Sequence, residues 1–218
     1  MKLRTLSTLA TICLLSAAAS TATANLLVNG DFEATPADVY FDGFDPTLAD
    51  DVPGWNLFLG AADGSYVYVN GFGSANVDVD TANGPSGGGL ETAVGSRPAV
   101  VPGYGYTASV TYDNYFSAGG AAYYIDWFDG VGALLGSIGG ALGDPNGPLV
   151  YEPYTQSFSV LGIAPASATA AGVRFTAANA GYNGVAADNF SLVPEPTSLA
   201  LFGLAFWVLI GLTIRKRS

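Results

Sequence analysis

Tyr123-Tyr124-Ile125-Asp126-Trp127-Phe128, followed at once by Asp129-Gly130, decides the fold class of this chain. Aromatic and β-branched residues dominate the first run, as is typical of a strand, and the Asp-Gly pair supplies the positive φ angles of a tight turn. The same composition recurs along the chain. It predicts further strands at residues 66–69, 76–79, 106–115, 155–160, 173–176 and 188–193.

Turn signals separate these segments. They are Asp42-Gly43, Asp63-Gly64, Asn70-Gly71, Asn83-Gly84, Asn146-Gly147 and Asn183-Gly184. Between residues 25 and 193 no long helical period occurs, although residues 164–171 could form a turn or two of helix. The glycine-rich runs 84–89 and 139–147 are predicted to be mobile surface loops. Short strands with regular turns predict one all-β domain, a β-sandwich or jelly roll.

The N-terminus has the features of a secretory leader. Lys2 and Arg4 precede an apolar stretch at residues 6–19, and Ala22-Thr23-Ala24 offers a small-residue cleavage site. We therefore predict a signal peptide at residues 1–24 that signal peptidase removes. Cys13, the one cysteine of the chain, lies inside this leader, so the mature protein cannot form an internal disulfide.

The C-terminus combines three features in order. Val193-Pro194-Glu195-Pro196-Thr197-Ser198 precedes an apolar run at residues 199–214, and Arg215-Lys216-Arg217 follow it. The prolines keep the first part extended and accessible to a protease. We predict a single transmembrane helix at about residues 198–214, of roughly 25 Å, with the basic tail 215–217 in the cytoplasm. An ordinary anchor that is never cleaved is the alternative.

Residues 194–218 resemble the PEP-CTERM sorting signal of Gram-negative bacteria that make extracellular polysaccharide. The resemblance implies that an exosortase-type membrane protease recognises the tail and cuts beside Pro194, Glu195 and Pro196. The precursor would be anchored in the inner membrane. The protein would then reach the cell surface or the extracellular matrix, where exopolysaccharide is a partner.

Removing both signals leaves an ectodomain at residues 25–193, and its charge is one-sided. Of the seven basic residues only Arg97 and Arg174 remain, against seventeen acidic residues, which gives a net charge of −15. Such a surface repels nucleic acid and anionic lipid and keeps a protein soluble. It excludes a nucleic-acid partner and offers oxygen ligands for divalent cations.

The ectodomain opens with Asn25-Leu26-Leu27-Val28-Asn29-Gly30-Asp31-Phe32-Glu33, has Pro53-Gly54-Trp55 later, and closes with Ala187-Asp188-Asn189-Phe190-Ser191-Leu192-Val193. These motifs, with Trp127-Phe128-Asp129-Gly130, resemble the galactose-binding-like jelly roll, which includes carbohydrate-binding modules. The resemblance implies that the first and last strands lie close together and are tied by a structural Ca²⁺. Asp31 or Glu33, a backbone carbonyl and Asp188 match that site; Asp31 as a turn cap and Asp188 as a surface residue are the alternative.

The residue types limit the chemistry. The chain has no histidine, and its ectodomain has no cysteine, which excludes imidazole bases, the usual triads and zinc sites. A glycosidase-like carboxylate pair remains, with Asp126 and Asp129 or Asp78 and Asp80 as candidates. Sugar rings would need exposed aromatic platforms. The candidates are Tyr66, Tyr68, Tyr104, Tyr106, Tyr112, Tyr115, Tyr123, Tyr124, Trp127, Tyr151, Tyr154 and Tyr182, although aromatic residues in a sandwich mostly lie in the core.

These observations predict an exported, non-enzymatic β-sandwich protein with a structural or adhesive role in an exopolysaccharide-rich envelope. A carbohydrate-binding module with a defined glycan is the first alternative. A hydrolase that uses paired carboxylates is the second.

Overall fold

The computed structural model describes residues 24–35, 39–41, 51–59, 66–69, 77–80, 88–114, 121–142, 156–177 and 184–195. The chain divides into two compact units, one of residues 25–192 and one that combines residues 1–24 with 193–218. The predicted leader and the predicted membrane helix lie almost wholly outside the described residues. In the described part of the chain, no helix is long and apolar enough to span a membrane.

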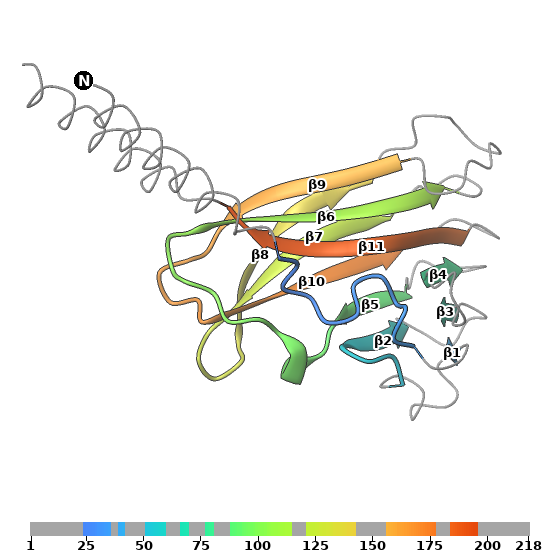
Figure 1. Ribbon diagram of the computed structural model, residues 1–218, viewed down its shortest axis with the longest axis horizontal. Coiled ribbons are helices and arrows are strands. Elements are labelled where there is room, and N and C mark those ends of the chain that lie inside the picture. Colours follow the sequence, from blue (N-terminus) through green and yellow to red (C-terminus); the bar gives the residue numbers. More distant parts are fainter. Residues whose placement is uncertain are drawn as a thin grey trace, which may run out of the picture. The chain divides into compact units, whose positions relative to one another are not determined.

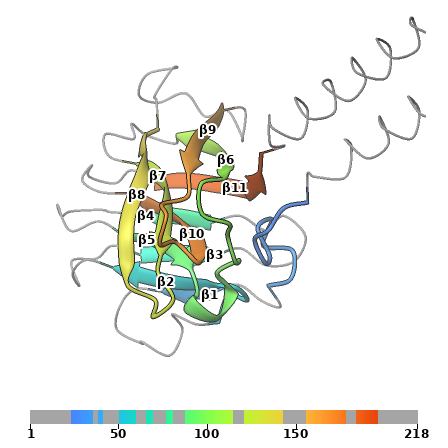
Figure 2. The same ribbon diagram turned by 90° about the vertical axis from the view of Figure 1, so that its left-hand side faces the viewer.

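Residues 25–192 form a sandwich of two sheets, with the strands of each sheet side by side (Figure 1, Figure 2). The six-stranded sheet runs, in spatial order, β1 (Val39–Phe41), β3 (Tyr66–Val69), β4 (Val77–Asp80), β11 (Gly184–Pro194), β6 (Gly105–Asn114) and β9 (Gln156–Ile163). The five-stranded sheet runs β2 (Trp55–Leu59), β5 (Gly88–Thr92), β10 (Ala170–Ala177), β7 (Ala122–Phe128) and β8 (Leu134–Ala141). A short 3₁₀ turn, η2 (Val94–Ser96), follows β5.

The two sheets are antiparallel, and side chains alternate between the core and the outer faces. In β6, for example, Tyr106, Ala108, Val110 and Tyr112 are buried, whereas the residues between them are half-buried. The core forms one continuous cluster of apolar side chains from both sheets. An exported domain without a disulfide thus derives its stability from core packing.

Phe190 of β11 lies at the centre of this core. Its ring contacts those of Phe32, Trp55, Tyr123 and Phe175, with centroids 5.2–5.7 Å apart and mostly edge-to-face. Such pairs add to the gain from apolar burial. The opening motif, the Gly-Trp motif and the closing motif therefore meet around one side chain.

The all-β prediction is confirmed, and each predicted strand overlaps an observed one. Two of the loop predictions are wrong in part. Gly88 and Gly89 belong to β5, and Gly139 and Gly140 belong to β8. A Cβ on Gly89 would lie 2.0 Å from the Phe175 carbonyl oxygen, and one on Gly139 would lie 2.1 Å from that of Tyr123. Glycine is used here for close approach between strands rather than for mobility.

Residues 164–171 are not helical. A turn at the loop between β9 and β10 leads directly into β10 at Ala170. The opening segment also differs from the expected first strand, because residues 24–35 form a series of turns beside β11.

Candidate functional site

The opening segment is fixed to the last strand by Asn25. Its side-chain amide donates to the Phe190 carbonyl oxygen at 2.9 Å, and its side-chain oxygen accepts from the Leu192 and Leu27 N–H groups at 3.0 and 3.1 Å. The Leu26 N–H donates to the Leu192 carbonyl oxygen at 2.9 Å. Asn25, the residue after the predicted leader, thus satisfies main-chain groups from both ends of the ectodomain.

Asn29 and Gly30 continue this closure. Asn29 has a φ of 52°, which asparagine tolerates better than most residues, and its side-chain oxygen accepts from the Ala34 N–H at 2.8 Å. The indole N–H of Trp55 donates to the Asn29 carbonyl oxygen at 2.9 Å. A Cβ on Gly30 would lie 2.2 Å from the Phe190 carbonyl oxygen, so only glycine fits at this position.

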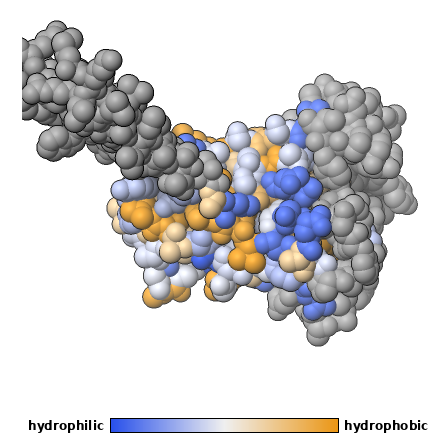
Figure 3. All heavy atoms as spheres, in the orientation of Figure 1, coloured by the Kyte–Doolittle hydropathy of each residue, from blue (hydrophilic) through white to orange (hydrophobic). Residues whose placement is uncertain are grey.

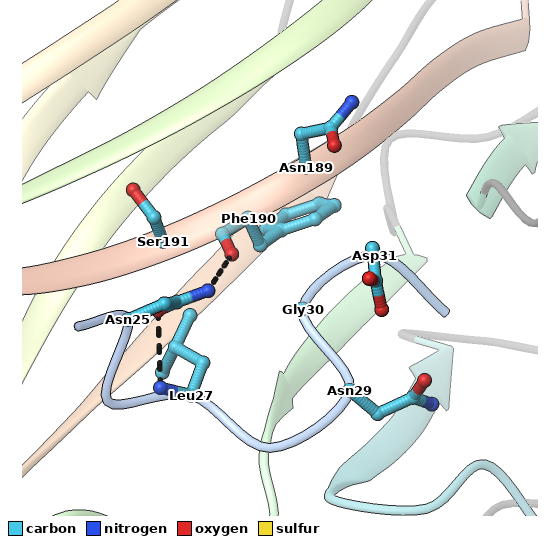
Figure 4. Close-up of a pocket in the computed structure, with 8 residues that line it drawn as sticks. All are labelled: Asn25, Leu27, Asn29, Gly30, Asp31, Asn189, Phe190 and Ser191. Atoms are coloured by element: carbon cyan, nitrogen blue, oxygen red, sulfur yellow. Dashed lines mark hydrogen bonds between the residues drawn. The ribbon is translucent and has the colours of Figure 1, made fainter. Parts of the chain in front are cut away.

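A pocket of about 460 Å³ opens between this segment and β11 (Figure 4). Its walls are mostly polar and come from the two terminal motifs. The lining residues are Asn25, Leu27, Asn29, Gly30, Asp31, Asn189, Phe190 and Ser191. The first and last parts of the domain therefore build one concave surface. Its carbonyl, amide and carboxylate oxygens are atoms that could bind a cation.

Asp188, next to this pocket, is half-buried. Burial and, to a smaller extent, the charges of Asp31 and Glu33 raise the pKa of its carboxyl group to about 6, although the hydrogen bond from the Asn189 N–H lowers it. The two side-chain oxygens of Asp188 accept from the N–H and the side-chain amide of Asn189 at 2.5 and 3.0 Å. Asp31 and Glu33 are thus near enough to Asp188 for their charges to act on its carboxyl group.

The donor chemistry suits a hard cation, since carboxylates and carbonyls are the ligands that Ca²⁺ prefers. Within the described residues, however, no three acidic side chains are arranged around a common point. Asp31 also caps its own turn, accepting from the Glu33 N–H at 3.4 Å. A cation here would therefore use at most two carboxylates, with carbonyl oxygens and water completing its coordination.

A second polar group lies on the outer face of the five-stranded sheet. Arg174 of β10 binds the buried Asp126 of β7 with two hydrogen bonds, Nε to Oδ2 at 2.7 Å and Nη2 to Oδ1 at 3.1 Å. Ser137 of β8 donates to the same carboxylate at 2.5 Å. The hydrogen bond with Asp126 raises the pKa of Arg174, and the guanidinium lies 4.7 Å from the centroid of the Tyr124 ring.

Arg97 adjoins this group. Its guanidinium carbon lies 3.5 Å from the centroid of the Phe128 ring, and Nη2 lies 4.0 Å from Oε1 of Glu91. Glu91 pairs in register with Arg174. Both basic residues of the ectodomain therefore lie on the outer side of one sheet, an arrangement that the sequence prediction missed. The available signal was that a domain with seventeen acidic residues has only these two basic ones, so each was a candidate for an ion pair.

The structure separates the aromatic candidates. Tyr106, Tyr112, Tyr123 and Trp127 are buried, and Tyr104 is exposed. Tyr124 is half-buried on the outer face, opposite Gly139. The side chain of Tyr66 and all of Tyr115, Tyr151, Tyr154 and Tyr182 lie outside the described residues. Tyr68 of β3 is half-buried as well, and Tyr124 lies beside the Arg174 guanidinium on the outer face of its sheet.

The acid pairs are placed differently. Asp126 is paired with Arg174, and Asp129 caps the β7–β8 turn by accepting from the Val131 and Ala133 N–H groups at 3.0 and 2.8 Å. Asp78 and Asp80 lie on β4, and their side chains are not described.

Of the predicted sorting residues, the structure describes two. Pro194 is the last residue of β11, and Glu195 follows it. Pro196, Arg215, Lys216 and Arg217 lie outside the described residues. The last core side chain before them is the fully buried Leu192.

Residues 192–217 match the model of the PEP-CTERM protein-sorting motif. The motif indicates an exported protein whose membrane-anchored precursor is sorted to the cell surface, and it implies processing by an exosortase. The motif begins within β11, two residues before its end. No curated protein matches the chain significantly.

Several solved structures are similar to this chain. The enzymatically active domain of tailspike protein 4 from bacteriophage CBA120 has a TM-score of 0.54 and 13% identity, covering 78% of this chain, which spans 21% of the tailspike chain. A cyclase from Fischerella sp. TAU has a TM-score of 0.51 and 19% identity, covering 78% of this chain and 96% of its own. A structure titled as CBM4 has a TM-score of 0.47 and 12% identity, covering 78% of this chain and 99% of its own.

Proposed function

We propose that the chain is the precursor of a non-enzymatic protein of the cell surface or extracellular matrix, with a structural or adhesive role among exopolysaccharides. The sorting motif at residues 192–217 carries this proposal. The leader would be removed before Asn25, and an exosortase-type protease would cut the tail beside Pro194, Glu195 and Pro196.

The closure of the domain supports this order of events. The hydrogen bonds of Asn25 end at Leu192, two residues before Pro194. Cleavage at Pro194–Pro196 would therefore release a domain that keeps its buried Leu192 and Phe190. Cleavage upstream of Leu192 would remove core side chains, and the domain would lose several kcal/mol of apolar burial.

The non-enzymatic reading is supported by the contacts of Asp126 and Asp129. A general acid or base has to be able to exchange a proton with a substrate. Asp126 accepts three hydrogen bonds from Arg174 and Ser137, and Asp129 caps a turn. Incubation of the released protein with a panel of polysaccharides tests this reading. Product formation that Asp126→Asn or Asp129→Asn abolishes would overturn it.

Matrix association is tested by co-sedimentation of the released protein with polysaccharide extracted from the host envelope. Retention that soluble fragments of the same polysaccharide prevent is the expected result. Recovery of all the protein in the supernatant, at every polysaccharide concentration, would contradict a matrix role.

A defined glycan site is the second candidate, and Tyr124 beside Arg174 favours it. The Tyr124 ring lies beside the Arg174 guanidinium, and Glu91 and then Asn56 follow Arg174 in the same register row. This row offers an aromatic surface with polar groups along one side of it. Tyr124→Ala would abolish binding on a glycan array, whereas Tyr104→Ala, at an exposed tyrosine elsewhere, would not. Binding that survives Tyr124→Ala would exclude this face.

We also propose a structural Ca²⁺ at the terminal pocket, held by Asp188 with Asp31 or Glu33 and a backbone carbonyl. The raised pKa of Asp188 supports it, because a cation would offset the burial of the Asp188 carboxylate and its repulsion by Asp31 and Glu33. The ion would stabilise the folded state because it would bind the folded chain and not the unfolded chain.

A further inference from the structure

One end of the sandwich carries the residues that adjoin the tail. We name it the exit end. It consists of three loops, which connect β5 to β6, β7 to β8 and β9 to β10: residues 93–104, 129–133 and 164–169. The three loops are joined by main-chain hydrogen bonds. Gly103 N–H donates to the Ala164 carbonyl oxygen at 2.8 Å, and Thr169 N–H donates to that of Phe128 at 2.9 Å.

Strand β11 ends at this same end. Ser109 of β6 contacts Ser191 of β11 through their hydroxyl oxygens at 2.7 Å, and β6 begins four residues earlier, directly after Tyr104. In Figure 1 the end of β11 lies on the left, where the loop between β9 and β10 also lies. The exit end is thus the end from which the chain continues into the sorting motif.

Most of the large apolar side chains that the described residues leave exposed lie at or beside the exit end. Val131 is 90% exposed, Ile163 67% and Leu161 58%. The full set here is Val94, Val101, Tyr104, Val131, Leu134, Leu135, Leu161 and Ile163. Figure 3 shows apolar residues gathered on this side of the body. A soluble protein rarely leaves so many apolar side chains together without a contact for them.

The exit end is also almost free of charge. Its three loops hold one base and one acid, Arg97 and Asp129, while the other sixteen acids of the ectodomain lie elsewhere in the sequence. The side chain of Arg97 is only 11% exposed, and Asp129 is engaged in its turn. Glu91 near the end of β5 and Glu195 directly after β11 adjoin these loops. The exit end thus carries only a small part of the negative charge that would keep this protein away from an anionic membrane.

The tether to the apolar run is short. Only residues 195–198 separate the end of β11 at Pro194 from Leu199. Four residues span at most ~14 Å when fully extended, and the headgroup layer takes up roughly 5–7 Å of that length. A membrane-anchored precursor must then hold the exit end close to the headgroups, where short tethering makes even a weak contact effective.

We propose that the exit end is a membrane-contact surface, which rests on the lipid headgroup interface while the precursor awaits removal of its tail. This inference rests on the proposed membrane anchoring. Val131, Leu161 and Ile163 would enter the interface as aliphatic anchors, and Tyr104 suits the boundary between headgroups and chains. The contact would position the segment at Pro194–Pro196 at the depth of a membrane protease and would end when the tail is cut.

The test places a fluorophore on the precursor, isolated from a host without the sorting protease and reconstituted in phosphatidylcholine vesicles that carry a lipid-bound quencher. Ile163→Cys and Ser157→Cys are matched labelling sites, since both are exposed on the same face at opposite ends of β9. Cleavage of the predicted leader would remove Cys13, the one native cysteine, so that only the introduced cysteine would be labelled. We expect the label at Ile163→Cys to lose emission to the lipid quencher and the label at Ser157→Cys to keep it.

A second variant, Val131→Asp in the Ile163→Cys protein, should restore emission, and its side chain is too exposed to disturb the core. Equal emission from both labels in protein that floats with the vesicles would overturn the membrane contact while leaving anchoring intact. Failure of the protein to float would overturn anchoring and the contact together. A change in the emission of the Ile163→Cys label that depends on protein concentration, and not on the lipid quencher, would overturn the proposal in favour of contact with a second copy.

Discussion

The side-chain amide of Asn25 donates a hydrogen bond to the carbonyl oxygen of Phe190, 165 residues later in the chain, at 2.9 Å. Asn25 is the first residue after the predicted leader, and Phe190 lies at the centre of the aromatic core. The residue that the predicted leader cleavage would expose is therefore bound to the strand that ends at the predicted site of tail cleavage.

Asn25→Ala should destabilise the released protein by about 1–3 kcal/mol, because it leaves the Phe190 carbonyl and the Leu192 N–H without their partner. Denaturant unfolding measures this change as a lower midpoint with an unchanged slope. Ser157→Ala, at an exposed position of β9, is the control and should leave the midpoint unchanged. Equal midpoints for the Asn25 variant and the control would contradict the role of Asn25.

Gly30→Ala should be more damaging. Its new Cβ would lie 2.2 Å from the Phe190 carbonyl oxygen, and the backbone of either the opening segment or β11 would have to shift. We expect a loss of several kcal/mol or failure to fold. Gly95→Ala is the matched control, because nothing lies within 4 Å of its Cβ position. A mild effect at Gly30, similar to that at Gly95, would show that the closure is loose.

The raised pKa of Asp188 predicts that the stability of the folded domain depends on pH when calcium is absent. The folded-state pKa is raised to about 6, whereas the unfolded value is about 3.9. A raised carboxyl pKa contributes stability below pH ~4 that is lost as the pH rises to about 6. Asp188→Asn should remove this dependence and melt higher than the wild type at pH 7 in chelator. A wild-type melting temperature that stays flat, or rises, between pH 4 and 6 would argue against this account.

Calcium should reverse the order of the two melting temperatures, so that the wild type melts higher than Asp188→Asn. If the ion binds at Asp188 with Asp31 or Glu33, millimolar Ca²⁺ raises the melting temperature of the wild type, and Asp188→Asn does not respond. Calorimetry with chelator and with calcium makes the comparison, and Mg²⁺ serves as the control ion. The same wild-type melting temperature in both conditions would exclude the site.

Arg174→Lys should weaken the domain, although it keeps the charge. Lysine cannot form the two hydrogen bonds to Asp126 in one plane, nor lie flat beside the Tyr124 ring. A loss of about 1–3 kcal/mol is expected, since Asp126 is buried and would be left partly unpaired. An unfolding midpoint equal to that of the wild type would mean that water replaces the guanidinium without cost.

The sequence was sufficient for the fold class, because alternating apolar residues and Asn-Gly or Asp-Gly turns are local signals. Residues 66–69 were predicted as a strand with the bounds that the structure has. Gly88, Gly89, Gly139 and Gly140 were misjudged as loop residues. At Gly89 and Gly139 the need for glycine comes from the main chain of a neighbouring strand, at Phe175 and Tyr123, which the local sequence does not show. The opening motif forms turns instead of a strand, and its Asn29-Gly30 pair was the local signal that the prediction did not use.

Site prediction shows the same limit. Asp31, Glu33 and Asp188 were named together through a resemblance, and the structure does bring them within electrostatic reach. The pairing of Arg174 with Asp126, and its position beside Tyr124, depend on the register of β10 with β7. Register between strands that are nearly fifty residues apart cannot be determined from composition or spacing.

The most direct test of the account is the intact mass and cell fraction of the protein in its native host, with and without the sorting protease. The account predicts a species that begins at Asn25, ends at Pro194–Pro196 and lies outside the inner membrane only when the protease is present. Without the protease, the tail should remain and hold the protein in the inner membrane. A full-length tail retained in the inner membrane of both strains would contradict it and reduce residues 194–218 to a simple anchor.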